Sequence, residues 1–290
     1  MTDISVLTPS YGYGRYIGDS ILSVLGQEGL SVQHVIQDAG SSDETLDVLG
    51  EFGDAVDWVS EPDEGQSDAL NRALERATGR WIGWLNADEF YLPGALSAML
   101  EWGEERQADV VHADTLFVNE RGRMLRLQPQ HRFSQTVLRL YGCFIASCGI
   151  VIRRSAIGDR PWDAGLRMMM DWELYLRLAT SGARFVTLAY PAGAFRWHGE
   201  RVTARRSDFA DEYPRIFGRY GISAQSRRWG RWLHGGYKFL SGSYLRQARA
   251  RSLQGMDMRW FAGREARENF TQLLETSYRR RVSTRDAPSR

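Results

Sequence analysis

The first half of the chain alternates short apolar runs with segments that have a helical pattern. Apolar runs lie at residues 4–7, 32–36, 56–59 and 81–85, and a helical pattern follows each of the first three. Ser41 or Ser42 can cap a helix over residues 44–52, and Ser67 can cap one over residues 69–77 that stops at Gly79. Strands separated by helices predict right-handed crossovers and a parallel sheet.

The second half mixes in antiparallel strands. A helix is expected after Pro93, followed by a strand over residues 109–112. A polar turn at residues 119–122 joins two apolar runs and predicts a hairpin. Further patterns predict a largely buried helix over residues 171–179 and separate strands over residues 184–190 and 194–197. We therefore expect an α/β fold with a mainly parallel central sheet and a small antiparallel part.

From about Ser207 onward the pattern is helical, rich in arginine and interrupted by glycines. Residues 201–290 carry 20 Lys+Arg against 8 Asp+Glu, a net charge of +12, whereas residues 1–200 carry 17 against 28, a net charge of −11. The overall charge of +1 hides this asymmetry. We expect a domain over residues 1–205 and a basic helical C-terminal extension over residues 206–290.

The composition is typical of a folded protein, with 43% hydrophobic and 25% charged residues. No apolar run reaches the roughly 18 residues needed to span a bilayer, and the sequence enters a strand without a signal-like segment. We therefore expect a cytoplasmic protein. Cys143 and Cys148 lack further ligands at metal-site spacing, so buried free thiols are expected.

A glycine-rich turn follows the first apolar run, in TPSYGYGRYIG over residues 8–18. Gly12, Gly14 and Gly18 have the spacing G-x-G-x-x-x-G, which is one residue longer than the dinucleotide-binding fingerprint. Asp38, however, lies where a ribose-binding acid belongs in a dehydrogenase. An NAD-dependent oxidoreductase is therefore one alternative.

The run WLNADE at residues 84–89 ends a buried strand abruptly. Asp88 and Glu89 then lie at the carboxyl end of that strand, where open α/β sheets bind ligands. Carboxylates at this place can hold Mg²⁺ or Mn²⁺ against a diphosphate, because hard cations bind carboxylate and phosphate oxygens together. The plainer interpretation is a solvated acidic turn.

Together with TPSYGYGRYI, QDAGSSDET and the block at residues 61–71, this run resembles glycosyltransferase family 2. A fourth block at residues 162–203 is similar to the family's acceptor-side segment, and the resemblance covers about residues 3–203. It implies a GT-A fold and inverting transfer from a nucleotide sugar. A catalytically silent nucleotide-sugar-binding module is the second alternative.

The resemblance also implies roles for particular residues. A nucleotide-binding set is implied at Pro9, Ser10, Tyr11, Asp38, Asp68 and Asn86. Asp88 matches the metal ligand, His198 a histidine that reaches the diphosphate or metal, and Asp171 the general base. Plainer interpretations are that Asp38 caps its turn, that Asp171 is a helix N-cap and that His198 is a surface histidine. Two departures stand out: Asn86 replaces a frequent aspartate, and Met170 precedes Asp171 where many relatives have glutamate.

The expected function is transfer of a sugar from a UDP, GDP or dTDP donor to a hydroxyl of a glycan, a lipid-linked intermediate or a small metabolite. The tail at residues 226–261 interleaves arginines with aromatic residues. Such a segment can pack on the acidic body or make peripheral contact with the inner face of the cell membrane. Nucleic acid is not expected, because no base-reading motif accompanies the charge. Gly230, Gly235 and Gly236 predict that no single helix continues through this segment.

Overall fold

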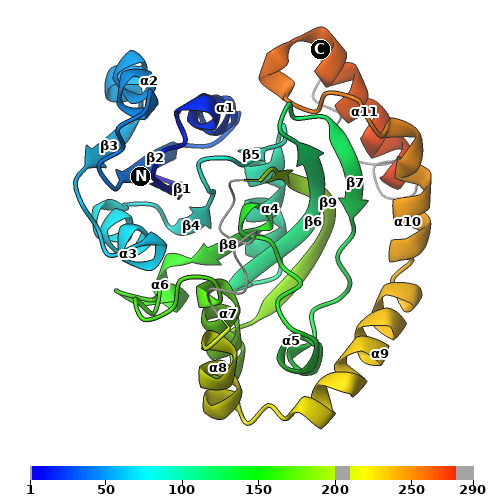
Figure 1. Ribbon diagram of the computed structural model, residues 1–290. Coiled ribbons are helices and arrows are strands. Elements are labelled where there is room, and N and C mark those ends of the chain that lie inside the picture. Colours follow the sequence, from blue (N-terminus) through cyan, green and yellow to red (C-terminus); the bar gives the residue numbers. More distant parts are fainter. Residues whose placement is uncertain (1, 200–209, 279–290) are drawn as a thin grey trace.

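The computed structural model describes residues 2–199 and 210–278 and is built around a nine-stranded sheet (Figure 1). The strands are β1 Ile4–Ser10, β2 Val32–Asp38, β3 Asp57–Ser60, β4 Trp81–Trp84, β5 Phe90–Tyr91, β6 Val110–Asn119, β7 Met124–Gln128, β8 Ile150–Arg153 and β9 Phe185–Trp197. Their order is β3-β2-β1-β4-β8-β6-β9-β5, with β7 paired to β6.

Helices cover both halves of this sheet. They are α1 Gly14–Leu25, α2 Thr45–Phe52, α3 Gln66–Arg76, α4 Ala95–Glu105, α5 Gln135–Tyr141, α6 Arg154–Ile157, α7 Met170–Thr180, α8 Glu212–Tyr220, α9 Ala224–Leu240, α10 Ser243–Arg249 and α11 Arg264–Tyr278. In Figure 1, α1, α2 and α3 lie around β1 to β4, while α9, α10 and α11 form an arc along the opposite edge of the molecule. Within the described ranges, no helix is both long and apolar enough to cross a membrane.

The four strands of the N-terminal half run parallel, as the apolar pattern predicted. Their register places Ser10 beside Asp38, and Asp38 beside Ser60. β4 pairs with β1 on the other side, and the chain leaves β4 at Leu85, whose N–H donates to the carbonyl of Leu7. The ends of β1, β2, β3 and β4 therefore meet at one edge of the sheet, where ligands bind in folds of this kind.

The C-terminal half contains the antiparallel part. β8 runs antiparallel to β4 and β6, and the predicted hairpin forms between β6 and β7. The two strands expected over residues 184–190 and 194–197 are a single strand, β9, which pairs with β6 through Pro191. Register shifts beside Asp114 absorb the irregularity on the β6 side. Pairing with a long neighbour thus overrides the break that the sequence indicates.

The helix starts differ from the expected caps. Gly65, with a φ of 111°, is the N-cap of α3, and the Ser67 hydroxyl instead donates to the carbonyl of Leu166 at 2.8 Å. The Ser41 hydroxyl is likewise used elsewhere, and the Asp43 carboxylate accepts the N–H of Thr45 at the start of α2. Helix positions follow from local periodicity, whereas the Ser67 hydroxyl bonds to a distant segment and the Ser41 hydroxyl donates to Asp38 at the end of β2.

The C-terminal extension packs against the antiparallel half of the sheet. A buried cluster joins strand residues to the extension, namely Phe90, Leu92, Leu116, Val118, Met124, Leu127 and Ala194 with Ala250, Leu253, Met258, Phe270 and Leu273. The charges also pair, because Arg246 of α10 contacts the fully buried Asp114 at 2.5 Å. This part of the basic tail therefore lies on the acidic body.

No single helix continues through residues 226–261, as expected, because α9 ends at Leu240 and α10 begins at Ser243. The glycines named for this break are wrong, because α9 continues through Gly230, Gly235 and Gly236. A Cβ atom on Gly230 would lie 2.3 Å from the carbonyl carbon and oxygen of Leu140 in α5. Glycine at this position therefore allows α9 to pack closely on α5. The tertiary contact compensates for the low helix propensity of glycine.

Leu253→Ala is expected to lower the free energy of unfolding by about 2–5 kcal/mol, because it opens a cavity where the extension meets the sheet. The side chain is fully buried in the cluster shared with Phe90 and Leu116. Urea unfolding followed by circular dichroism measures the change. Leu245→Ala on the exposed face of α10 is the matched control and should change stability by less than about 0.5 kcal/mol. Equal effects of the two substitutions would mean that the extension does not stabilise the body.

Candidate active site

The glycine-rich turn after β1 is hydrogen-bonded to side chains of the turn that follows β2. The N–H of Gly12 donates to the Ser41 hydroxyl at 2.8 Å, and the N–H of Gly14 donates to the Asp43 carboxylate at 3.0 Å. A Cβ on Gly14 would lie 2.6 Å from the Thr45 nitrogen. Gly14 therefore allows α1 to pack against the start of α2, and the N–H groups of both glycines are not available to a pyrophosphate.

Tyr11 and Asp38 lie at neighbouring strand ends but in different environments. The Tyr11 side chain is 67% exposed where β1 leaves the sheet, next to buried Pro9 and Ser10. Asp38 is fully buried, and its carboxylate accepts hydrogen bonds from the N–H groups of Gly40 and Ser41 and from the hydroxyls of Ser41 and Ser60. Asp38 therefore builds the turn at the end of β2, and Tyr11 offers an open aromatic face beside it.

The block at residues 61–71 connects α3 to the segment before α7. Asp68 lies in the first turn of α3, and its carboxylate pairs with Arg72 at 2.7 Å and with Arg160 at 3.3 Å. Asn71 donates its amide to the carbonyl of Trp162 at 2.8 Å and accepts the Trp162 N–H at 3.1 Å. With the Ser67 contact to Leu166, these bonds fix the chain that leads to Asp171.

Asn86 needs the amide group that distinguishes it from aspartate. Its side-chain oxygen accepts hydrogen bonds from Gln66 at 2.7 Å and from the Trp84 indole at 2.9 Å. Its side-chain nitrogen donates to the Ser147 hydroxyl at 3.2 Å. An ionised carboxylate could not make this donation. Asn86 thus holds the end of β4 against the segment before β8.

Glu89, which the sequence analysis placed beside Asp88 at this strand end without assigning it a role, belongs to the same network. It is 1% exposed and accepts hydrogen bonds from the Asn86 N–H and the Ser147 hydroxyl. Burial, followed by the neighbouring charge of Asp88, raises the pKa of Glu89 to about 8. The sequence signal for Glu89 was its position at the end of a buried strand. No sequence pattern indicated that Ser147 belongs to the site.

Asp88 and His198 converge, as the resemblance implied. The Nε2 atom of His198 lies 2.7 Å from an Asp88 carboxylate oxygen, and both residues are buried. The ring of Tyr16 packs beside His198, with ring centroids 5.1 Å apart. His198 is therefore not a surface histidine. Thr203, which ends the matching stretch, lies outside the described residues.

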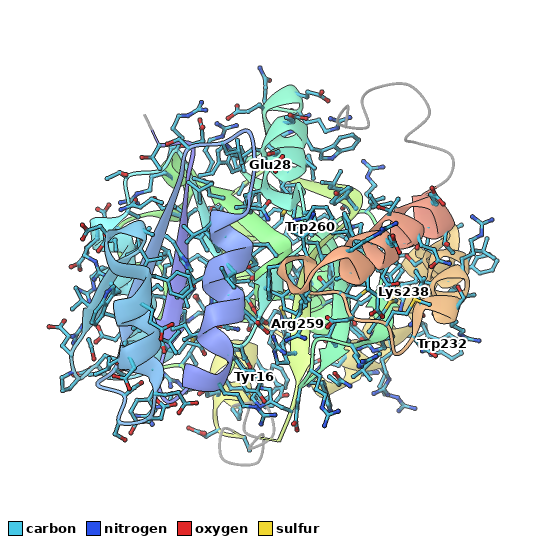
Figure 2. All side chains as sticks on the ribbon, turned by 90° about the horizontal axis from the view of Figure 1, so that it is seen from above. Tyr16, Glu28, Trp232, Lys238, Arg259 and Trp260 are labelled. Carbon is cyan, nitrogen blue, oxygen red and sulfur yellow. The ribbon has the colours of Figure 1, made fainter. Side chains whose placement is uncertain are left out.

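Arg196 in β9 supports the Asp88–His198 pair. Its guanidinium donates to the backbone carbonyl of Asp88 at 2.8 Å and to the carboxylate of Asp19 in α1 at 2.6 Å. Asp19 also lies 3.7 Å from Arg259 of the extension, and Figure 2 shows Arg259 between α1 and α11. Sequence analysis missed Arg196, for which the signal was a charged residue inside an apolar strand pattern. It ties the Asp88 turn to α1 and to the extension.

The donor set of Asp88 and His198 fits a divalent cation that shares its coordination with a substrate. Among the described residues, no group of three or more His, Cys, Asp or Glu side chains could hold a metal ion. Two protein ligands leave further coordination positions for phosphate oxygens and water, as is usual for Mg²⁺ at phosphate sites. The chemistry of these residues is therefore compatible with a metal bound together with a diphosphate.

Asp171 is the second residue of α7, and Met169 rather than Asp171 is the N-cap. Its carboxylate accepts the Trp172 N–H at 2.6 Å, and the half-buried free thiol of Cys143 also bonds to it. Burial raises the pKa of Asp171 to about 6, although these two hydrogen bonds oppose the increase. The base candidate is thus ionised at neutral pH but not strongly acidic.

The fully buried Tyr175 connects the surroundings of Asp171 and Glu89. Burial raises the pKa of the Tyr175 phenol well above its usual value, and the charges of Cys143, Asp171 and Glu89 add to this effect. The two carboxyl groups therefore act electrostatically on one buried phenol. The end of β4 and the start of α7 face the same part of the interior, because Trp84, Met170 and Tyr175 belong to one buried cluster.

Glu212 of α8 holds the segment that precedes Asp171. Its carboxylate accepts the N–H groups of Arg167, Met168 and Met169 at 2.7, 3.1 and 2.9 Å. The residue is buried despite lying in the basic tail. Sequence analysis missed it, because an acid beside Asp211 in a charged segment resembles a solvated residue. The C-terminal extension therefore helps to place the candidate base.

Comparisons with known proteins agree with this fold. The family model described as Glycosyl transferase family 2 matches residues 5–160. The putative teichuronic acid biosynthesis glycosyltransferase TuaG of Bacillus subtilis is 36% identical over 107 residues, which are 36% of this chain and 42% of that relative. A PGL/p-HBAD biosynthesis glycosyltransferase of Mycobacterium tuberculosis is 26% identical over 186 residues, which are 62% of this chain and 70% of that relative. The match to TuaG thus spans less than half of TuaG.

Two solved structures show the same fold. S. aureus TarS 1–349 in complex with UDP-GlcNAc has a TM-score of 0.59 at 18% identity, over 74% of this chain and 65% of that one. The mannosyltransferase PcManGT from Pyrobaculum calidifontis, in complex with GDP-Man and Mn²⁺, has a TM-score of 0.57 at 15% identity, over 97% of this chain and 90% of that one. These likenesses confirm the expected fold class.

Proposed function

Because the chain belongs to glycosyl transferase family 2 and has the GT-A fold, we propose that it moves a sugar from a nucleoside-diphosphate sugar to a hydroxyl acceptor, with inversion at the anomeric carbon. The observation that carries this proposal is the buried Asp88–His198 pair at the carboxyl edge of the sheet. Family membership decides against an NAD-dependent oxidoreductase. The occupied N–H groups of Gly12 and Gly14 agree with that decision.

The donor base is proposed to lie against Pro9, Ser10 and Tyr11, where the exposed Tyr11 ring can stack on it. Asp38 shapes this pocket by holding the turn after β2, and Asp68 acts through its paired arginines. TarS was solved with UDP-GlcNAc and PcManGT with GDP-Man, which supports a nucleotide-sugar donor. UDP, GDP and dTDP sugars are the proposed candidates. Asn86 contributes by fixing the end of β4 beside the donor.

Asp88 and His198 are proposed to hold Mg²⁺ or Mn²⁺. A divalent cation bound there supplies positive charge against the negative charge that develops on the leaving diphosphate. PcManGT was solved with Mn²⁺, which supports the use of such an ion. Arg196 fixes the Asp88 backbone, and Tyr16 packs on His198, so both ligands are held in place before the donor binds.

The general base is proposed to be Asp171. Its carboxylate takes the proton from the acceptor hydroxyl as that oxygen attacks the anomeric carbon from the face opposite the leaving diphosphate. Because burial raises its pKa to about 6, Asp171 is a stronger base than an exposed aspartate and is still ionised at pH 7. Glu212 and the α3 contacts fix the segment that presents it.

The turnover number is expected to fall as pH decreases below about 6, because protonated Asp171 cannot accept the acceptor proton. The sign follows from the raised pKa: the active, ionised form predominates above about 6, and each pH unit below it costs about tenfold in kcat. Initial rates at saturating donor and acceptor between pH 5 and pH 8 measure this dependence. Donor binding over the same range is the control and should change much less. A flat kcat profile down to pH 5 would contradict Asp171 as the base.

The acceptor is proposed to be a glycan, a lipid-linked intermediate or a small metabolite, with the enzyme in the cytoplasm at the inner face of the cell membrane. The relatives support a carbohydrate or lipid context, because they are named for teichuronic acid and PGL/p-HBAD biosynthesis. Peripheral contact through the basic C-terminal region would bring the site to lipid-linked acceptors.

Thermal unfolding with UDP, GDP, dTDP or NAD, each with and without Mn²⁺, tests the proposed function. A ligand that binds only the folded protein raises the unfolding midpoint. We expect a metal-dependent increase with one of the three nucleoside diphosphates, followed by turnover of the corresponding nucleotide sugar. An increase with NAD alone would overturn the proposal. Binding of a donor without hydrolysis or transfer would identify a catalytically silent module.

A further inference from the structure

The outward face of α9 and α10 is apolar and aromatic, although surface helices usually present polar residues to water. The exposed fractions are 66% for Trp229, 80% for Trp232, 76% for Phe239, 85% for Leu240 and 64% for Leu245. The opposite side of α9 packs on α5, so this face has no partner within the described chain. Figure 1 places both helices on the outer edge, and Figure 2 shows Trp232 at the periphery.

Positive charge surrounds this apolar face. Residues 213–256 contain no aspartate or glutamate. Arg228, Arg231, Arg249 and Arg251 are exposed, and no carboxylate of the described ranges forms an ion pair with any of them. Exposed aromatic and aliphatic side chains beside unpaired arginines are typical of helices that lie at a membrane surface.

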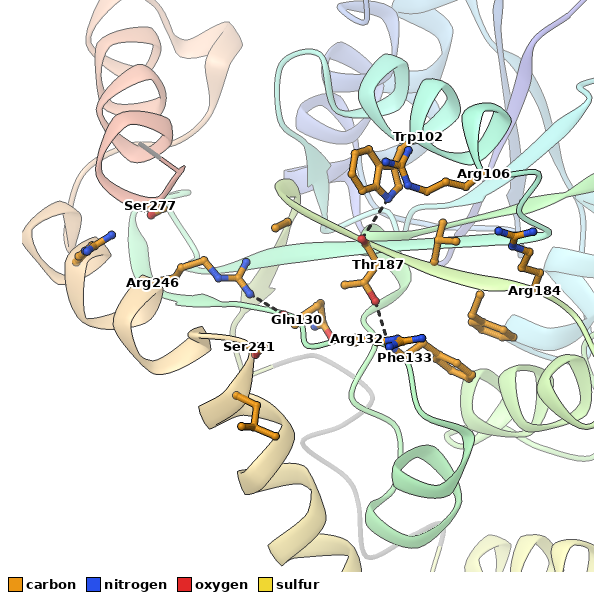
Figure 3. A pocket seen from close by; sticks show the side chains of 15 residues that line it. Trp102, Arg106, Gln130, Arg132, Phe133, Arg184, Thr187, Ser241, Arg246 and Ser277 are labelled. Carbon is orange, nitrogen blue, oxygen red and sulfur yellow. Dashed lines mark hydrogen bonds between the residues drawn. The ribbon is translucent and has the colours of Figure 1, made fainter. Parts of the chain in front are cut away.

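A cleft of about 900 Å³ continues this surface between α4, β9 and α10 (Figure 3). Its lining includes Arg106, Arg132, Arg184, Arg246 and Arg249, and it shares Leu240 and Arg249 with the α9–α10 surface. No described carboxylate lines the cleft. Arg246 pairs with Asp114 and Arg106 pairs with Glu105, whereas Arg132 and Arg184 form no ion pair with a described carboxylate. The cleft therefore offers positive charge to an anionic group.

We propose that this α9–α10 face docks on an anionic phospholipid surface. The apolar side chains lie at the level of the headgroups and acyl chains, and lipid phosphates occupy the arginine-lined cleft. Arginine binds phosphate well because its planar guanidinium can donate two parallel hydrogen bonds. Tryptophan favours the interface because it combines a large apolar ring with an N–H donor.

Two other occupants fit the surface less well. A second copy related by a two-fold axis would bring the same arginines together, and residues 213–256 provide no carboxylate to compensate. A single-stranded nucleic acid could stack on Trp232. It would leave Leu240 and Leu245 exposed to water, and these two leucines are among the most exposed apolar residues. A lipid surface buries the aromatic and the aliphatic side chains together.

Flotation with lipid vesicles tests this inference. Wild-type protein should bind vesicles of phosphatidylcholine mixed with phosphatidylglycerol, but not vesicles of phosphatidylcholine alone. The double substitution Trp232→Ser and Leu240→Ser should weaken this binding by at least about tenfold, because it removes two of the most exposed apolar side chains. The double substitution Arg228→Gln and Arg231→Gln should also weaken it by at least about tenfold and reduce its salt dependence.

Leu46→Ser is the matched control, because Leu46 is an exposed leucine on α2, on the opposite side of the molecule. It should leave vesicle binding unchanged. Absence of wild-type binding to the anionic vesicles would overturn the inference. Equal binding by the wild type and the Trp232→Ser, Leu240→Ser protein would also overturn it. A dimer that this double substitution converts to a monomer, without vesicle binding, would assign the face to a second copy.

This inference can fail while the proposed transferase function stands, because Asp88, Asp171 and His198 do not belong to the α9–α10 face. Nucleotide-dependent thermal stabilisation of the same preparations separates the two outcomes. A vesicle-binding defect with normal nucleotide stabilisation reports on the membrane surface alone. A nucleotide-binding defect with normal vesicle binding reports on the donor site alone.

Discussion

Asp171→Asn is expected to abolish sugar transfer while leaving donor binding nearly unchanged. Asparagine has almost the shape of aspartate and can still accept the Trp172 N–H, so α7 should begin as before. Its amide cannot take a proton from the acceptor hydroxyl, and the loss of a general base typically lowers kcat by about 10²–10⁴-fold. Single-turnover transfer with a radiolabelled donor measures the rate, and calorimetric titration of the donor measures binding.

Glu173→Gln is the matched control, because Glu173 is the acid two positions further along α7. Its carboxylate is buried against Arg219 at 2.9 Å and the Tyr220 hydroxyl at 2.9 Å, rather than beside Asp171. This substitution should lower thermal stability more than it lowers kcat. Normal turnover by the Asp171→Asn protein would show that another group accepts the proton.

Asp88→Ala is expected to impair both donor binding and turnover. The substitution removes the carboxylate that meets Nε2 of His198, and with it the anionic member of the proposed metal site. The metal-dependent part of donor affinity should disappear, and kcat/KM should fall by about 10²–10³-fold, because the leaving diphosphate loses electrostatic stabilisation. Donor binding measured over a Mn²⁺ titration, together with initial rates, reports both effects.

Glu64→Gln is the control for this experiment. Glu64 is an exposed acid in the turn between β3 and α3, and it makes no described contact with His198. Its replacement removes the same charge from the same edge of the sheet and should leave Mn²⁺-dependent binding intact. Unchanged Mn²⁺ dependence in the Asp88→Ala protein would remove Asp88 from the metal site.

The expected site residues fall into two groups, which differ in the contacts that the structure gives them. The resemblance implied both Asp88 and His198, and the structure brings them together across 110 residues of sequence. The hydrogen bonds of Asp38 agree with the plainer interpretation that it caps its turn, because its carboxylate holds the turn after β2. Asp68 is engaged by Arg72 and Arg160. The motifs that carry the resemblance thus contain residues that build the site as well as residues proposed to contact the substrate.

The sequence by itself determined the strands and helices of the N-terminal half, because apolar periodicity depends only on residues that are close together in sequence. It also determined the family, through four ordered blocks. The break expected between residues 190 and 194 and the glycine interruptions expected in α9 were wrong, since pairing with β6 and packing on Leu140 stabilise these segments from outside.

Only the tertiary structure decided the supports of the site. Arg196 meets Asp19 across 177 residues, and Glu212 of the basic tail holds the segment before Asp171. The same is true of the outward face of α9, because the contact of Gly230 with α5 decides which side of this helix faces water. Such contacts depend on where folding places distant segments, and a local pattern of residue types carries no information about that placement.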